Sequence, residues 1–205
     1  MNRPLHKLMS EVRHIFAKMQ GAALGVKITK TLQKEEFSDF LKKLGYSNVE
    51  LSDHKYYLTD WNTWKIIIDD SFVKEFEYVS DRFDCDNFAD YFNSSVAAIY
   101  GLNTSGRFSV ELLEPDTGNH IGWHRSSLVI CTESRDREKE ELYKILIKAG
   151  ASKESAQEAV DLVEDKVVAY AYDPMLNGED NYCKIADEDI VIKDWRYRGW
   201  FASFN

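Results

Sequence analysis

The chain has few cysteines and none of the paired spacing that builds a metal or disulfide framework. Its 205 residues include three cysteines, an odd number, at wide spacing and without a Cys-x-x-Cys pair. A disulfide scaffold is therefore disfavoured, and free thiols under reducing conditions are expected. A Cys/His metal site drawn from Cys85, His120, His124 and Cys183 is disfavoured for the same reason, because no two of these residues have a useful ligand spacing.

The chain also lacks an excess of basic charge and any long apolar run. Acidic residues outnumber basic ones by 35 to 26, which gives a net charge of -9. Duplex nucleic acid and anionic membranes both require a basic surface, so neither is expected as a partner. No stretch approaches the ~20 apolar residues of a membrane span, and the N-terminus has no signal-peptide pattern. These patterns predict a cytoplasmic protein, or one exported without a recognisable signal peptide.

What the chain does contain is enough apolar material for one sizeable domain. Hydrophobic residues make up 44% and aromatic residues 13% of the sequence, and no repeat or low-complexity segment interrupts it. Apolar residues at helical spacing predict helices over residues 4–20 and 34–44. The sequence therefore predicts an N-terminal helical segment, residues 1–50, followed by one domain over residues 51–205.

The second segment alternates between helical and strand patterns. A helical aromatic stripe follows Asp60, and another helix runs from about Cys85 to Tyr100. Alternating or continuous apolar residues then predict strands at 106–113, 123–131, 167–172, 190–192 and 197–204. Two charged helices over residues 134–165 interrupt this series as a helical hairpin. The pattern predicts an α+β fold, in which an antiparallel sheet packs against the helix that begins at Cys85.

Cys85 stands at the start of that helix, which is a favourable place for a thiolate. Asp84 is a good N-cap, and Phe88, Phe92 and Val96 follow at helical spacing. Free backbone N–H groups and the positive end of the helix dipole stabilise negative charge there. The negative charges of the flanking Asp84 and Asp86 disfavour a thiolate, so an activating base has to come from elsewhere in the chain. The alternative is that Cys85 is a small buried residue of the helix.

A histidine and an acid occur at strand ends that could meet this cysteine. His124 lies near the start of one predicted strand, and Asp173 directly follows the end of the next. Adjacent antiparallel strands bring such positions together, and a thiol nucleophile needs a base whose tautomer a third group fixes. We therefore predict a catalytic set of Cys85, His124 and Asp173. His120 is an alternative base, because it lies four residues before His124 and points to the same side of a regular strand.

The residues around Cys85 resemble a known motif. The block Asp84-Cys85-Asp86-Asn87-Phe88-Ala89, preceded by Trp64 and Tyr78, is similar to the cysteine block of a papain-like cysteine-peptidase family. The best-known member of that family is the C-terminal domain of a mushroom ricin-type agglutinin. The resemblance covers about residues 56–205, and His124 and Asp173 match the family's histidine and carboxylate by order. The sequence departs from the family in having Trp123 before the histidine, the hairpin at 134–165, and no glutamine shortly upstream of Cys85.

The resemblance implies a papain-like or transglutaminase-like fold and a Cys-His-Asp triad. The implied function is a thiol-dependent hydrolase or acyl transferase, most simply a cysteine peptidase acting on a protein or peptide substrate. The alternative is a catalytically inert protein-binding module that retains the fold. Trp64 and Trp123 are expected to line a substrate cleft. No cofactor is required, but the family member uses calcium, and hard oxygen ligands are available here from Asp84, Asp86 and Asp90.

Overall fold

The structure is a computed structural model, and it describes residues 25–46, 48–80, 82–114, 116–176, 181–185, 190–192 and 195–204. The helix predicted over residues 4–20 lies outside these residues. The predicted division of the chain at residue 50 stays a prediction.

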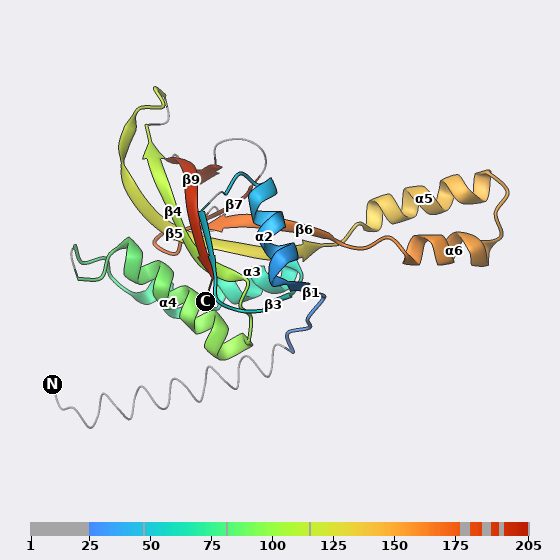
Figure 1. Cartoon of the computed structure of the whole chain (residues 1–205), viewed down its shortest axis with the longest axis horizontal. Coiled ribbons are helices and arrows are strands. Elements are labelled where there is room, and N and C mark those ends of the chain that lie inside the picture. Colours follow the sequence, from blue (N-terminus) through green and yellow to red (C-terminus); the bar gives the residue numbers. More distant parts are fainter. Residues whose placement is uncertain are drawn as a thin grey trace.

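The fold centres on a mixed seven-stranded sheet in which the strands follow the order β2-β9-β4-β5-β6-β7, with β8 also paired to β9. Antiparallel pairing joins every pair of neighbours except β2 and β9, which run parallel. Figure 1 shows β4, β5 and β9 side by side in the middle of the molecule. The strands are β2 (Asn48–Leu51), β4 (Ser105–Leu113), β5 (His120–Glu133), β6 (Lys166–Tyr172), β7 (Tyr182–Lys184), β8 (Ile190–Ile192) and β9 (Trp195–Phe204).

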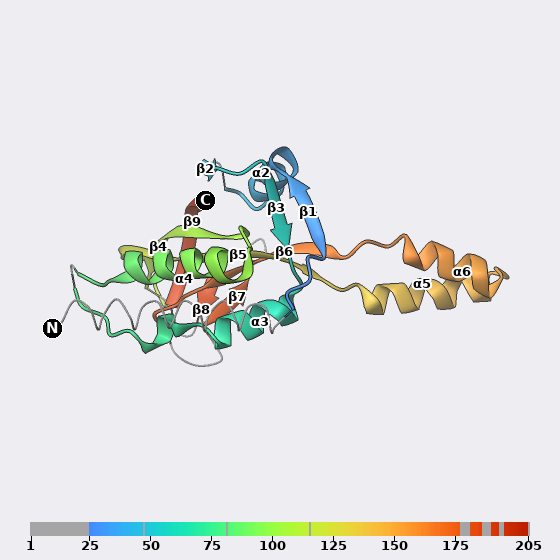
Figure 2. The same cartoon turned by 90° about the horizontal axis from the view of Figure 1, so that it is seen from below.

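One face of this sheet is covered by helices α3 (Trp61–Asp69) and α4 (Cys85–Tyr100), with the short helix η1 (Phe72–Glu75). Figure 2 shows α4 lying along the sheet. The i, i+4 stripe of α4 packs on alternate residues of β5 and β6, which include Val129 and Tyr172. The helix ends at Gly101, whose φ of 67° is the left-handed C-cap conformation that favours glycine.

The opposite face carries a second, smaller layer. It consists of a two-stranded antiparallel sheet, β1 (Lys30–Gln33) with β3 (Lys55–Leu58), and helix α2 (Lys34–Lys43). Phe37 of α2 stacks on Tyr56 of β3 with ring centroids 4.1 Å apart. Both rings pack towards Leu128 and Ile130 of β5. The continuous apolar run of β5 is thus buried on both of its faces, as is typical of a central strand.

A helical arm extends from the sheet between β5 and β6. It is made of α5 (Asp136–Lys148) and α6 (Lys153–Asp161), which pack against each other. Figures 1 and 2 show that this arm projects away from the rest of the molecule. Residues 134–165 therefore form a helical hairpin inserted between two neighbouring strands, as the sequence predicts.

The predicted fold class is nevertheless wrong. A papain-like or transglutaminase-like fold with an antiparallel sheet was expected, whereas the sheet is mixed because β2 pairs in parallel with β9. A second sheet, β1 with β3, adds a layer that the prediction lacked. These three strands have only four residues each, too few for a periodic pattern to distinguish them from loops.

Candidate functional site

Cys85 is the first residue of α4, where the chain turns from an extended segment into the helix. Asp84 is the N-cap, and its backbone N–H donates to Oδ1 of Asn87 at 3.1 Å. This reciprocal capping box fixes the first turn of the helix, and therefore also the position of the thiol. Cys85 as a residue is half-buried, so part of it is accessible to solvent.

Asp86 is one polar neighbour of the thiol. The Cys85 Sγ lies 3.6 Å from Oδ1 of Asp86, at a distance at which the thiol donates to the carboxylate. The other oxygen of Asp86 lies 2.8 Å from a guanidinium nitrogen of Arg125 on β5. Arg125 thus offsets the negative charge beside the thiol and ties the start of α4 to the sheet.

His124 and Asp173 meet next to this helix start. Ser127 of β5 lies opposite Tyr172 of β6, so Asp173 emerges beside the part of β5 that carries His124. His124 Nε2 lies 2.8 Å from Oδ2 of Asp173. The side chain of His124 is 14% exposed and that of Asp173 is 2% exposed, so the contact is largely shielded from water.

The carboxylate of Asp173 is held in place by the loop after β6. Its Oδ1 accepts a hydrogen bond from the backbone N–H of Met175 at 3.0 Å. Its own backbone N–H donates to the carbonyl of Asn181 at 2.8 Å, and its carbonyl accepts from Leu176. Because both carboxylate oxygens have fixed partners, the side chain presents Oδ2 to His124 in one orientation.

The ionisation of His124 reflects both of its partners. Burial lowers the pKa of its imidazole, but hydrogen bonds to Asp173 and Cys85, and the charges of these two groups, raise it more. The resulting pKa is about 9, above the ordinary value of 6.5. His124 is therefore protonated at neutral pH. Since its Nε2 contacts Asp173, its Nδ1 is the ring nitrogen left for Cys85.

His120, the alternative base, lies apart from this arrangement. Its Nδ1 is 2.9 Å from Oε1 of Glu111 on the neighbouring strand β4, and its ring packs 5.2 Å from that of Trp123. A register shift between Leu112 and Leu113 of β4 breaks the regular strand opposite His120. The assumption that His120 and His124 point to the same side depended on a regular strand.

The two tryptophans predicted to line a cleft have different surroundings. Trp64 of α3 is fully buried, whereas Trp123 is 66% exposed. A fully buried ring cannot line a surface cleft. Trp64 is a core residue, and Trp123 keeps a surface position on the strand that carries His124.

The three predicted calcium ligands do not form one cluster. Ligand atoms of Asp84, Cys85 and Asp86 lie within 4.8 Å of one another. Asp90 lies elsewhere on α4, where its two oxygens are 2.5 and 2.6 Å from the guanidinium of Arg107 on β4. Asp86 has its own arginine partner in Arg125. Calcium binding by these residues stays a prediction of the sequence.

Neither arginine was predicted from the sequence as a residue of the site. Arg125 directly follows His124, and Arg107 is the third residue of the neighbouring strand β4. The available signal was a basic residue directly after a predicted site residue, in a chain with a net charge of -9. The ion pairs depend on the register of β4 and β5, which the sequence pattern alone does not fix.

Comparisons with known proteins give no family assignment. No protein-family model matches the chain, and neither does any curated protein. Among solved structures, the one described as "PSL1a-E64 complex" is 15% identical, with a TM-score of 0.47, over 85% of this chain and 51% of that chain. A structure of Polyporus squamosus lectin bound to a human-type influenza-binding epitope is 18% identical, with a TM-score of 0.42, over 77% of this chain and 42% of that chain. The chain spans about half the length of these structures.

These comparisons correct the sequence-based identification. Membership of a papain-like cysteine-peptidase family is wrong, because no family model and no curated protein supports it. The predicted hydrolase, acyl-transferase or cysteine-protease function is wrong for the same reason, and the alternative of an inert protein-binding module gains no support. The identification depended on one six-residue block, Asp84 to Ala89, and such a block specifies a helix start rather than a family.

The expectation that no segment spans a membrane can be compared with the helices of the structure. In the part of the chain that the structure describes, no helix is both long and apolar enough to cross a bilayer. The cellular compartment and the expected protein or peptide partner stay predictions.

Proposed function

We propose that Cys85, His124 and Asp173 form a nucleophilic thiol site, in which Cys85 makes a covalent bond to an electrophilic ligand. The observation that carries this proposal is the pair of contacts made by one imidazole. His124 interacts with a buried carboxylate through Nε2 and with the thiol of Cys85, the first residue of α4, through its other side. The proposal concerns the reactivity of the Cys85 thiol towards electrophiles as a class.

The role of His124 is to take up the proton of the thiol. Asp173 keeps the Nε2–H tautomer of the neutral ring, which leaves the Nδ1 lone pair for the S–H proton of Cys85. Transfer of that proton produces a thiolate beside an imidazolium. The raised pKa of His124 supports this assignment, because it means that the folded protein favours the charged ring. The imidazolium in turn stabilises the thiolate through its charge.

The role of Cys85 is nucleophilic attack. Its thiolate attacks an electrophilic carbon, the new S–C bond forms, and the leaving group departs with the electron pair of the broken bond. The start of α4 contributes the positive end of the helix dipole to the same sulfur. The negative charge of Asp86 destabilises the thiolate, and the ion pair between Asp86 and Arg125 weakens this effect.

The test is alkylation by iodoacetamide between pH 6 and 7, with the modified cysteine identified by mass spectrometry. A free thiol is only a few per cent ionised near neutral pH, so a thiolate–imidazolium pair is expected to react about tenfold faster or more. Cys85 should be labelled first, and His124→Gln should slow it to the rate of an ordinary thiol.

Cys131 and Cys183 are internal controls for this test. Cys131 is fully buried and its thiol pKa is raised, mainly by burial, so it should stay unlabelled in the folded protein. Cys183 is half-buried like Cys85 but lies on β7, away from α4. Labelling of Cys85 and Cys183 at equal rates, unchanged in His124→Gln, would show that the site has no special reactivity.

A further inference from the structure

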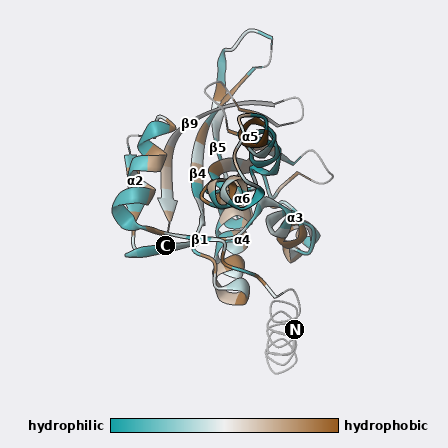
Figure 3. Cartoon of the chain, turned by 90° about the vertical axis from the view of Figure 1, so that its right-hand side faces the viewer, coloured by the Kyte–Doolittle hydropathy of each residue, from teal (hydrophilic) through white to brown (hydrophobic). Residues whose placement is uncertain are grey.

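The helical arm formed by α5 and α6 buries little of its apolar surface. None of the residues of α5 is buried, and in α6 only Ala156 and Val160 are. Ile145 of α5 is 64% exposed, and Leu162, directly after α6, is 82% exposed. Figure 3, which looks along the arm, shows hydrophobic residues in α5. Most of the stability of a helix in a protein comes from the packing of its apolar face, so a partner that covers the arm is expected.

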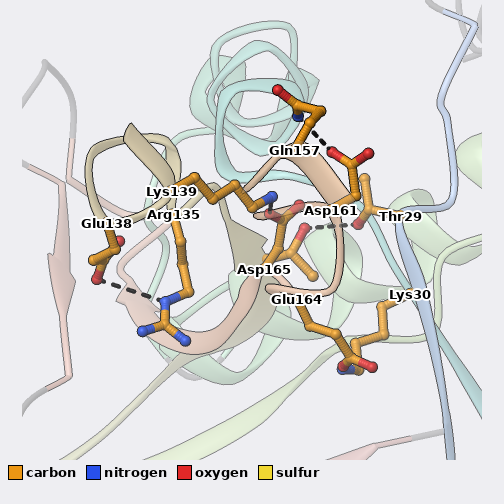
Figure 4. Close-up of polar contacts among 10 residues, drawn as sticks. Thr29, Lys30, Arg135, Glu138, Lys139, Gln157, Asp161, Glu164 and Asp165 are labelled. Atoms are coloured by element: carbon orange, nitrogen blue, oxygen red, sulfur yellow. Dashed lines mark hydrogen bonds and ion pairs between the residues drawn. The ribbon is translucent and has the colours of Figure 1, made fainter. Parts of the chain in front are cut away.

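Polar contacts at the base of the arm hold it away from the sheet. Lys30 of β1 forms an ion pair with Glu164, and Lys139 Nζ of α5 lies 3.1 Å from Oδ1 of Asp165. Figure 4 shows these contacts, and Figure 1 shows the arm projecting from the sheet. In the part of the chain that the structure describes, α6 is the main neighbour of α5. The exposed side of α5 therefore faces outward, where another molecule can reach it.

The charges of α5 are divided between its two halves. Residues 136–141 contain four acidic and two basic side chains, whereas residues 142–148 contain two basic side chains and no acidic one. Net charges of -2 and +2 are complementary when two copies of the helix lie side by side in opposite directions. The same division suits the dipole of a single helix, but the dipole does not account for the exposed Ile145 where the two halves meet.

One side of α5 combines this charge pattern with the exposed isoleucine. Glu141 and Lys148 lie one turn before and one turn after Ile145, within about 60° of it around the helix. The side chain of Glu141 is 61% exposed, and its i, i+4 ion pair with Arg137 is a long contact of 3.4 Å at the surface. Such a pair contributes little to stability, so Glu141 can turn to a second basic partner at small cost.

We propose that two copies of the chain pair through their α5 helices, which run antiparallel about a twofold axis near Ile145. The Ile145 side chains of the two copies pack against each other, and Glu141 of each copy pairs with Lys148 of the other. An isologous contact of this kind is closed, so it produces a dimer and not a filament. This inference is independent of the proposed thiol site.

The length of the arm permits this register. When residue 141 lies opposite residue 148, Ala151 at the tip of one arm lies opposite Glu138 in the first turn of the other α5. The tip of each arm therefore ends before it reaches the sheet of the other copy. Two single helices bury less than the roughly 1,200 Å² of a stable interface, so we expect a weak dimer with a dissociation constant in the micromolar range.

The test is analytical ultracentrifugation of the 205-residue chain at up to about 200 µM, well above the dissociation constant of a micromolar dimer. The wild-type protein should show a monomer–dimer equilibrium. Ile145→Asp should weaken dimerisation about tenfold or more, because it places a charge at the centre of the contact. Ile147→Asp is the matched control, since it introduces the same charge about 200° further around the helix, and it should leave the dimer unchanged.

An exchange of charges tests the antiparallel register. Glu141→Lys and Lys148→Glu should each weaken dimerisation, because like charges then meet twice across the axis. An equimolar mixture of these two variants should dimerise again, because each of its contacts joins opposite charges. Circular dichroism of each variant checks that the helices of the arm are still formed.

Three results would overturn the proposal. The first is a wild-type protein that stays monomeric at about 200 µM, although a micromolar dimer would form there. The second is a dimer that is equally stable in Ile145→Asp and Ile147→Asp. The third is a mixture of Glu141→Lys and Lys148→Glu that dimerises no more strongly than either variant alone.

Discussion

His124 is the residue on which the electrostatics of the site depend, because its ring contacts both the thiol and the buried acid. Its pKa of about 9 exceeds the value of 6.5 for an ordinary histidine, which the unfolded chain should approach. A group whose pKa is raised by folding stabilises the folded state fully below the unfolded value, and this stabilisation is lost as the pH rises through the folded value. The free energy of unfolding should therefore decrease between pH 6.5 and 9.

This pH dependence can be measured by urea unfolding at several pH values. A raised pKa of this size corresponds to a loss of up to about 3 kcal/mol across the interval. The variant His124→Gln should lack most of the decrease. A decrease of the same size in the wild-type protein and in His124→Gln would assign the effect to other groups.

Substitutions of Asp86 and Arg125 should change the reactivity of the Cys85 thiol in opposite directions. Asp86→Asn removes a negative charge 3.6 Å from the Cys85 sulfur and should increase iodoacetamide labelling of Cys85 at neutral pH by a few-fold. Arg125→Gln leaves the Asp86 carboxylate without its ion-pair partner and should decrease that labelling.

Asp90→Asn is the matched control for these substitutions. It removes a similar Asp–Arg pair on the same helix, one turn from Asp86, without touching the thiol. Equal effects of Asp86→Asn and Asp90→Asn on the labelling of Cys85 would mean that the charge beside the sulfur has no specific role.

The candidate site could be predicted in part from the sequence. Cys85, His124 and Asp173 were selected by their order on a helix start and two strand ends, and the structure brings them together. The arginine partners of Asp86 and Asp90 were missed because they depend on strand register. Trp64 was assigned to a cleft because an aromatic residue on a helix has the same pattern whether it faces the core or a binding surface.

At the level of elements, the close approach of β4 and β9 is sensitive to substitution. A Cβ atom at Gly106 would lie 2.4 Å from the carbonyl oxygen of Ser203 and 2.6 Å from the ring of Phe204. The backbone of β9 cannot move away from such a contact without distorting its pairing with β4. Gly106→Ala should therefore lower the free energy of unfolding by about 2 kcal/mol or more.

Gly122→Ala is the control for this substitution. Gly122 also lies in a long strand, but a Cβ there would meet nothing within 4 Å. Urea unfolding should show a small change for Gly122→Ala and a large one for Gly106→Ala. Similar stability of the two variants would contradict the close packing of β4 against β9.

Long elements were predictable and short ones were not. The strands β4, β5 and β6 and the helix α4 carry enough residues for their periodicity to be recognised. The four-residue strand β2 has no such signal, and its parallel pairing with β9 joins residues about 150 positions apart, which no local pattern encodes. This one pairing turned the expected antiparallel sheet into a mixed one.

In the molecule as a whole, the arm is an insertion in a body formed by the sheet and its two covering layers. The final pair in the register of β5 and β6 is Glu133 with Lys166, so the arm leaves and returns at neighbouring positions. A two-residue Asn-Gly turn suits such a hairpin. Replacement of residues 134–165 by this turn should leave a folded protein whose Cys85 is labelled by iodoacetamide within about twofold of the wild-type rate.

Circular dichroism and the labelling rate check this prediction together. None of the buried residues in the two hydrophobic clusters on either side of the sheet belongs to the arm, which is why the rest of the protein should remain folded. Loss of folding in the deletion variant would show that the arm is part of the core structure.

The most direct test of the central claim is an NMR titration of the His124 ring in the wild-type protein and in Cys85→Ala. We predict a pKa of about 9 for His124 in the wild-type protein and a lower value in Cys85→Ala, because the thiol is one of the groups that raise it. An ordinary pKa near 6.5 in both proteins would contradict the thiolate–imidazolium pair on which the proposed function rests.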